Sequence, residues 1–184
     1  MVEISLHVLD IVQNSIKAGA SLVEIIIDEN VADNLLTITV NDNGCGMDSE
    51  FLSDVTNPFR TTRTTRKVGL GISMFKSAAE LTGGSFEIWS EVGKGTGLRA
   101  TFVYDSIDRQ PLGDMASTMS TVIHANPDID YLYTHSYNHN TFEFDSREIR
   151  TVLGSEISLS QPEVLKWIEN YIKNETDNIC GGAI

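Results

Sequence analysis

The sequence has only two cysteines, Cys45 and Cys180, among its 184 residues. Two thiols are too few for a disulfide scaffold, and they lack the spacing of a metal site. No apolar run approaches the roughly 18 residues that a membrane helix needs. The first twenty residues interleave acidic and amide side chains with apolar ones, unlike a secretory leader. These absences predict a globular, cytoplasmic protein that does not bind a membrane.

Basic residues are also scarce, with 13 Lys and Arg against 26 Asp and Glu, a net charge of −13. Such a charge repels phosphate backbones, so nucleic-acid binding is not expected. A phosphate ligand would need a local basic cluster, and the segment NPFRTTRTTRKVGLG supplies one with Arg60, Arg63, Arg66 and Lys67. A charge run alone is more often a solvated loop. Its position before a glycine-rich helix start favours a phosphate site.

Hydrophobic periodicity predicts the order of elements in the first hundred residues. The pattern indicates two β-hairpins, each following a helical segment, and a polar segment at 56–67 without any period. This order predicts an α+β protein, a two-layer sandwich with helices on one face of a mostly antiparallel sheet. The expected helices are 3–18, 48–54 and 71–81, and the expected strands are 21–29, 34–42, 85–91 and 97–104.

Four separated segments resemble the ATP-binding domain shared by DNA gyrase B, heat-shock chaperone ATPases, histidine kinases and MutL mismatch-repair proteins. In chain order they are LDIVQNSIKAGA, NDNGCGM, VGLGIS and GKGTGLRATF, within residues 4–104. The stretch from NPFRTTR onward is most similar to the histidine-kinase branch, whereas DNGCGM after NSIKAGA is more similar to MutL. The resemblance implies the two-layer Bergerat ATP-binding fold, with ATP and Mg²⁺ as ligands.

On the adenine side, the resemblance gives Asp42 the role of accepting the exocyclic amine. A carboxylate held at a strand end supplies a charge-assisted hydrogen bond, although an Asp before Asn-Gly is also a common turn residue. Gly44 and Gly46 would let the backbone approach the ligand without a Cβ in the way. Thr96 would bond adenine or a neighbouring water, and a Gly-Thr turn residue without a ligand is the alternative. Cys45, between the two glycines, is interpreted as a packing residue.

On the helix at 3–18, the resemblance makes Asn14 the Mg²⁺ ligand and Asp10, one turn earlier, the catalytic residue. An amide oxygen suits Mg²⁺, and a carboxylate can orient or deprotonate an attacking hydroxyl or water. An exposed polar helix face is the alternative. Hydrolytic relatives carry Glu where this chain has Asp10, so the reach is shorter by about one bond length.

The phosphate side is assigned to the start of the helix at 71–81. Gly69, Leu70 and Gly71 would offer free N–H groups and the positive end of the helix dipole to phosphate oxygens. Arg66 and Lys67, on a loop that orders with nucleotide, would close over the γ-phosphate. The interval between these basic residues and the glycines is shorter than in many kinases.

Beyond residue 105 the resemblance ends. Residues 1–105 are therefore expected to form the ATP-binding domain, 112–175 a small α-β-β-α extension of unknown role, and 176–184 a disordered tail. In the extension we expect helices at 112–125 and 161–174, with strands at 128–138 and 141–153. His135 and His139 flank the turn between these strands, where a polar strand surface is expected and metal binding is the alternative.

Three functions remain open from the sequence. The first is a stand-alone kinase-type protein that transfers the γ-phosphate to a separate protein partner, since no dimerisation helix with an acceptor histidine precedes the domain. The second is an ATPase or nucleotide-dependent switch, and the third is an ATP-binding module without catalysis. The sequence identifies neither the phosphoacceptor nor the oligomeric state.

Overall fold

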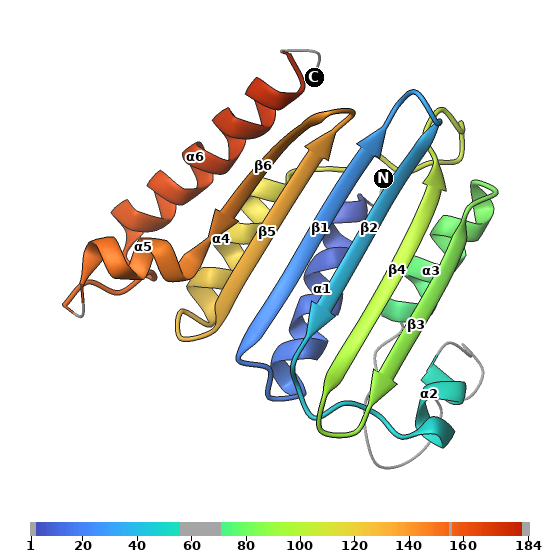
Figure 1. The fold of residues 1–184 in the computed structure, drawn as a ribbon, viewed down its shortest axis with the longest axis horizontal. Coiled ribbons are helices and arrows are strands. Elements are labelled where there is room, and N and C mark those ends of the chain that lie inside the picture. Colours follow the sequence, from blue (N-terminus) through green and yellow to red (C-terminus); the bar gives the residue numbers. More distant parts are fainter. Residues whose placement is uncertain (1–2, 56–70, 155, 182–184) are drawn as a thin grey trace.

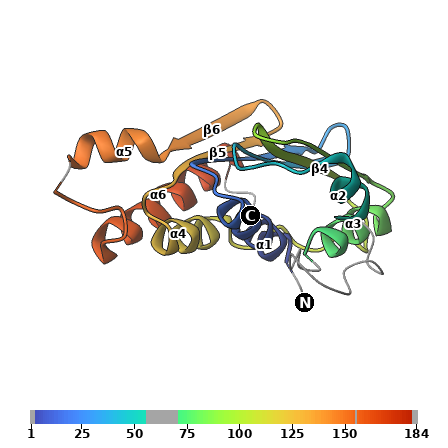
Figure 2. The same ribbon diagram turned by 90° about the horizontal axis from the view of Figure 1, so that it is seen from below.

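The computed structural model describes residues 3–55, 71–154 and 156–181. Six strands form one sheet, and helices gather on one of its faces (Figures 1 and 2). Within these residues, no helix combines the length and hydrophobicity needed to cross a bilayer. In chain order the elements are α1 (Ile4–Lys17), β1 (Leu22–Asn30), β2 (Leu35–Asp42), α2 (Ser49–Val55), α3 (Gly71–Leu81), β3 (Ser85–Glu91), β4 (Gly95–Val103), α4 (Met115–Ala125), β5 (Asp130–Tyr137), β6 (Asn140–Asp145), α5 (Ser146–Leu153) and α6 (Pro162–Ile179).

The strand order across the sheet is β3-β4-β2-β1-β5-β6. Neighbours pair antiparallel except β1 and β5, which run parallel. The α+β sandwich with a mostly antiparallel sheet is therefore confirmed. The register places Asp42, the last residue of β2, opposite Thr96 near the start of β4. Two residues assigned to the adenine side are thus cross-strand neighbours.

The core lies between the sheet and helices α1, α3, α4 and α6, which share one side of it in Figure 2. The alternation of residues along β1 shows which face of the sheet carries the core. Val23, Ile25 and Ile27 are fully buried, and the residues between them are half-buried. Helix α1 buries Ile4 and Val8 against this face. Because α1 lies at the centre of the helical layer, its position depends on neighbours from both halves of the chain.

The extension continues the sheet. Strand β5 pairs with β1 over eight residues, from Leu22 opposite Asp130 to Glu29 opposite Tyr137. Tyr131 and Tyr133 of β5 are fully buried beneath the helices. Strand β1, one of the two central strands, is therefore shared, with β2 on one side of it and β5 of the extension on the other.

His135 is buried, contrary to the expectation of a polar strand surface, with an exposed fraction of 1%. Its Nε2 lies 2.8 Å from Oε1 of Glu29 on β1, and its Nδ1 lies 2.9 Å from the hydroxyl of Tyr133. Tyr104 donates from its hydroxyl to the other oxygen of Glu29 at 3.1 Å. A buried polar group needs such partners, because losing water without a hydrogen bond costs free energy. The pairing of β1 with β5 brings Glu29 to His135 and so offsets the cost of burying the imidazole.

Two further predictions for the extension are wrong. The strand expected at 141–153 ends at Asp145, and residues 146–153 form helix α5. Asp145 is its N-cap, because its side chain accepts a hydrogen bond from the Arg147 amide at 2.8 Å. The disordered tail expected from 176 is helical through Ile179, and Cys180 is buried. Apolar contacts of Ile172 and Ile179 with the core hold this last part of α6 in place.

Candidate functional site

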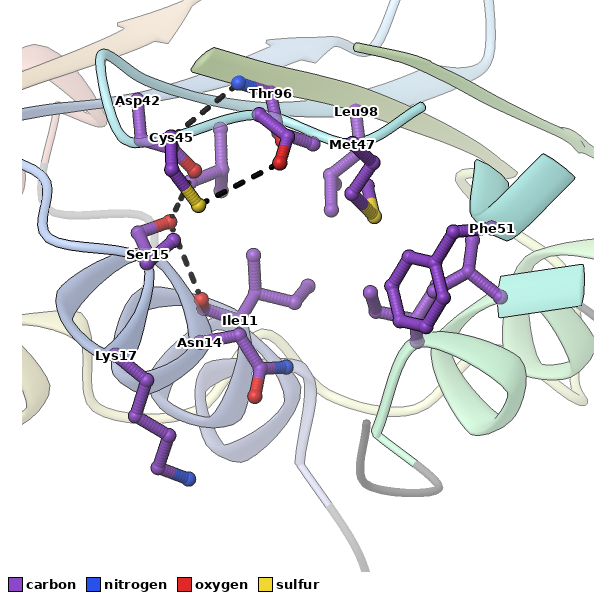
Figure 3. A pocket seen from close by; sticks show the side chains of 15 residues that line it. Ile11, Asn14, Ser15, Lys17, Asp42, Cys45, Met47, Phe51, Thr96 and Leu98 are labelled. Atoms are coloured by element: carbon purple, nitrogen blue, oxygen red, sulfur yellow. Dashed lines mark hydrogen bonds between the residues drawn. The ribbon is translucent and has the colours of Figure 1, made fainter. Parts of the chain in front are cut away.

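A cavity of about 570 Å³ opens between α1, the strand ends of β2 and β4, α2 and the start of α3 (Figure 3). This volume lies within the range of about 300–1,000 Å³ that is usual for small-molecule sites. Most of its wall is apolar, and polar side chains are concentrated along α1 and at the strand ends. The lining residues are Ile11, Asn14, Ser15, Lys17, Ala18, Val40, Asp42, Cys45, Gly46, Met47, Phe51, Val55, Ile72, Thr96 and Leu98.

Asp42 is fixed in the wall by three donors. The backbone amides of Gly44 and Thr96 donate to its Oδ1 at 2.9 and 3.2 Å, and the Ser15 hydroxyl donates to its Oδ2 at 2.6 Å. These donors come from the loop after β2, from β4 and from α1, so the orientation of the carboxylate is set by three parts of the fold. Each carboxylate oxygen can accept more than one hydrogen bond, which leaves acceptor capacity for a ligand.

The hydroxyl of Thr96 belongs to a second, smaller network. Ser90 donates its one hydroxyl proton to the Gly95 carbonyl at 2.8 Å and accepts from the Met47 amide at 2.8 Å. Since Ser90 has no second proton, the 2.8 Å contact between Ser90 and Thr96 must use the proton of Thr96. The lone pairs of the Thr96 hydroxyl therefore remain available as acceptors beside Asp42.

Two glycines allow the strand ends to approach closely. Gly46 has φ +67°, and a Cβ there would lie 2.0 Å from the carbonyl oxygen of Glu91. Gly95 has φ +113°, and its Cβ would lie 1.9 Å from the carbonyl oxygen of Asp42. Both positions need glycine for backbone packing as well as for φ. The structure thus adds a reason for Gly46 that is independent of any ligand.

Gly44, in the loop after β2, is confined by the end of α1 and by Asp42. A Cβ at this position would lie 2.9 Å from the carbonyl oxygen of Ala18 and 3.1 Å from Oδ1 of Asp42. Cys45, expected to be a packing residue, is exposed and lines the cavity. The loop after β2 therefore packs through its glycines and presents its thiol to the cavity.

Helix α1 brings Asn14 to the cavity, together with Lys17 one turn later. Asp10 is exposed and lies one turn earlier, against the start of α3. A Cβ at Gly71 would lie 3.1 Å from the Cβ of Asp10 and 3.3 Å from its Oδ2. Gly71, the first residue of α3, is buried, so the carboxylate and this helix start are in contact distance. Arg66, Lys67, Gly69 and Leu70, like the loop expected at 56–67, lie outside the described residues.

The sequence interpretation overlooked Ser15 and Lys17. Ser15 has an exposed fraction of 3% and falls on the apolar face of α1. A polar residue within an apolar stripe was the available signal, because a buried hydroxyl requires a partner. That the partner is Asp42, 27 residues later, is a property of the tertiary structure. Lys17 is an exposed residue of α1, and its place at the cavity depends on how the helix packs.

Comparison with known proteins shows the family of residues 2–106. The model of the family described as histidine kinase-, DNA gyrase B- and HSP90-like ATPases matches residues 2–106. A putative sensor protein of Shewanella frigidimarina is 40% identical over 96 residues, which cover 51% of this chain and 15% of that protein. An uncharacterized sensor-like histidine kinase of Rhizobium meliloti is 32% identical over 103 residues, 53% of this chain and 20% of that protein.

These relatives support the histidine-kinase branch of the family, and this chain spans only a small part of their length. Among solved structures, the N-terminal domain of a DNA repair protein is similar with a TM-score of 0.55 and 15% identity. That similarity covers 84% of this chain and 58% of the other. At this identity the similarity shows the fold alone.

Proposed function

Because this chain belongs to the family of histidine kinase-, DNA gyrase B- and HSP90-like ATPases, we propose that its cavity binds Mg²⁺-ATP. The observation that carries the proposal is the carboxylate of Asp42, held by three donors in the wall of a cavity of about 570 Å³. A preorganised carboxylate suits the exocyclic amine of adenine, and the Thr96 hydroxyl offers a second acceptor beside it. The apolar walls from Val40, Met47 and Leu98 suit a flat base.

The phosphates would extend along α1 toward the start of α3. The side chain of Asn14 lines the cavity and carries a neutral amide oxygen, which fits the oxygen preference of Mg²⁺. Bound Mg²⁺ would neutralise phosphate charge. Lys17 adds a positive charge on the same helix. The free backbone amides at the start of α3, which begins at Gly71, would donate to phosphate oxygens. The sequence also predicts a role at the phosphates for Arg66, Lys67, Gly69 and Leu70.

We further propose that the γ-phosphate is transferred to a residue of a separate protein. The position of Asp10 favours a chemical role, because its side chain on α1 lies against the start of α3, one turn from Asn14. From there its carboxylate would orient the attacking hydroxyl or accept its proton.

An ATPase or nucleotide-dependent switch is the second candidate, favoured by the packing of α1 against α4 of the extension. A module without turnover is the third, favoured by the shorter Asp10 side chain.

Calorimetry with Mg²⁺-ADP and Mg²⁺-ATP on the full chain tests the binding step. Asp42→Asn replaces an ionised acceptor by an amide of the same size, and a hydrogen bond to a charged group contributes about 1.5–3 kcal/mol. We expect the dissociation constant to rise about 10- to 100-fold. Asp108→Asn, an exposed carboxylate in the linker after β4, is the matched control. Equal affinity in the Asp42 variant and the wild type would refute the adenine assignment.

Incubation with γ-labelled ATP and Mg²⁺, with and without cell extract, separates the three functions. Label on a second protein supports transfer, release of phosphate by the chain alone supports hydrolysis, and binding with neither supports a silent module. Asp10→Asn should keep nucleotide affinity and lose turnover, whereas Asn14→Ala should weaken Mg²⁺-dependent binding. Full turnover in Asp10→Asn would show that Asp10 is not the base.

A further inference from the structure

The linker between β4 and α4 is anchored at both ends. At one end the guanidinium of Arg109 lies over the ring of Tyr104, 4.6 Å from its centroid, and Tyr104 donates to Glu29, the partner of His135 on β5. At the other end Asp114 caps α4 by accepting a hydrogen bond from the Ser117 amide at 2.8 Å. The segment 110–113 is therefore held between these anchors and leads directly into α4, the first helix of the extension.

This segment also holds the start of α1. The amides of Ile4 and Ser5, which have no acceptor within the helix, donate to the carbonyls of Pro111 and Leu112 at 3.0 and 2.8 Å. The two segments lie so close that a Cβ at Gly113 would approach the Ser5 hydroxyl to 2.4 Å. Free amides at a helix start need external acceptors. For α1 the linker of the extension supplies two of them.

His7 adds a side-chain contact one turn further along α1. It is buried, and its Nε2–H donates to Oε1 of Gln110 at 3.0 Å. Its ring packs on Phe75 of α3, with 5.5 Å between the centroids. Burial lowers the pKa of His7, against the smaller opposing effects of Gln110 and Asp10, so the ring is neutral at pH 7. His7 therefore touches the linker and α3 at the same time.

We propose that the segment Gln110–Gly113 is a clamp that positions α1, with His7 as the positioning residue, so that the extension controls the nucleotide site. The inference rests on the proposed function. An α-helix moves as a rigid rod with a rise of about 1.5 Å per residue, so a shift of its start is transmitted to Asp10 and Asn14. Asp10 already lies against Gly71, and an error of about 1 Å at such a site can cost about 100-fold in rate.

Energetic coupling between two sites is reciprocal, so bound nucleotide should tighten the clamp. Exchange of the Ile4 and Ser5 amide protons reports the clamp directly, because both donate to the linker. The test uses the full chain, measured by NMR with and without Mg²⁺-ATP. We expect nucleotide to slow exchange of these two amides in the wild type. We also expect Gln110→Ala to lose this response and to bind nucleotide at least about fivefold more weakly, the lower end of typical coupling.

Two variants separate positioning from simple destabilisation. Gln110→Glu keeps the acceptor for His7 and should restore the response, while Gln13→Ala changes an exposed side chain of α1 and should behave as the wild type. If the wild type binds nucleotide but exchange of Ile4 and Ser5 is indifferent to it, or Gln110→Ala retains full affinity, the clamp is refuted and the proposed function stands. If the wild type binds no nucleotide, both are refuted.

Discussion

At the scale of single residues, the site depends on a few buried polar contacts that cross the fold. Ser15 and Asp42 lie 27 positions apart in the chain, yet their 2.6 Å hydrogen bond sets the carboxylate against the cavity. His7 is a second case, since its donor group faces Gln110, 103 positions later. Such contacts affect both function and stability, because a buried donor or acceptor left without its hydrogen bond raises the free energy of the folded state.

We predict that Ser15→Ala weakens nucleotide binding more than it lowers stability. The change removes a donor to Oδ2 of Asp42 and lets the carboxylate turn, at a cost of about 1–3 kcal/mol in the bound state. That corresponds to a roughly 5- to 150-fold weaker affinity by calorimetry. Thr82→Ala, which removes another buried hydroxyl, just after α3, should lower the melting temperature similarly and leave affinity unchanged. Equal affinity in both variants would contradict the role given to Ser15.

We predict that His7 makes folding stability fall as the pH is lowered below about 6.5, the ordinary pKa of histidine. Burial lowers the pKa of folded His7, so the unfolded chain takes up the proton first. Stability is then lost until the pH reaches the lowered pKa of the folded state, with a slope of at most about 1.4 kcal/mol per pH unit. The charged group that faces His7 is Asp10 on α1, and its effect is smaller than that of burial.

Denaturant unfolding of the wild type and His7→Gln across pH 5–8 measures this effect. Glutamine does not titrate, so the wild type should lose stability relative to the variant as the pH falls. His124→Gln, at an exposed position on α4, serves as the control and should follow the wild type. Parallel curves for the wild type and His7→Gln would contradict the assignment.

At the scale of elements, the site is assembled where strand ends and helix starts meet. Strands β2 and β4 bring Asp42 and Thr96 opposite each other, and α1 supplies the residues for the other wall. The loop between β3 and β4 must turn tightly for this to happen. Gly95 is a residue at which the two strand ends approach closely, because a Cβ there would meet the carbonyl oxygen of Asp42.

We predict that Gly95→Ala disrupts both folding and binding, whereas Gly93→Ala is mild. Both glycines have positive φ, +113° and +79°, but a Cβ at Gly93 has nothing within 4 Å. Gly93→Ala should therefore cost only backbone strain, about 1 kcal/mol. Gly95→Ala adds a collision with the Asp42 carbonyl and should cost several-fold more. Chemical denaturation compares the two, and equal losses of stability would show that the turn has room to adjust.

At the scale of the whole molecule, the extension is built into the same sheet as the nucleotide site. It covers one side of β1 and packs α4 against α1. The 1–105 segment that carries the family resemblance would, if isolated, leave the β1 edge open and part of the α1 surface uncovered. The structure thus links the two parts of the chain through their core.

We predict that a chain truncated after Asp105 unfolds at a lower temperature than the full chain. A loss of about 3 kcal/mol would lower the melting temperature by about 10 °C for a protein of this size, and the lost burial of Tyr131 and Tyr133 makes a loss of at least this size reasonable. Circular dichroism melts of both chains measure the difference. A truncated chain that melts with the full chain would show that the extension is an independent domain.

The sequence by itself determined the parts of this protein whose signal is local. Alternation and helical spacing predicted the first seven helices and strands, and the four motifs predicted the family that the comparisons show. The resemblance carried by these motifs also indicated Asp42, Thr96 and Asn14, which the structure brings to one cavity. Local patterns suffice here because periodicity reports which face of an element is buried.

Only the tertiary structure decided which element covers the apolar face of each helix and strand, and which polar groups form hydrogen bonds with one another. The pairing of β5 with β1, the burial of His7 and His135, and the contact of Ser15 with Asp42 all join residues distant in the chain. A polar residue in a strand or helix pattern does not reveal whether water or a partner satisfies it. The answer depends on which element packs beside it, and that choice is made by the core as a whole.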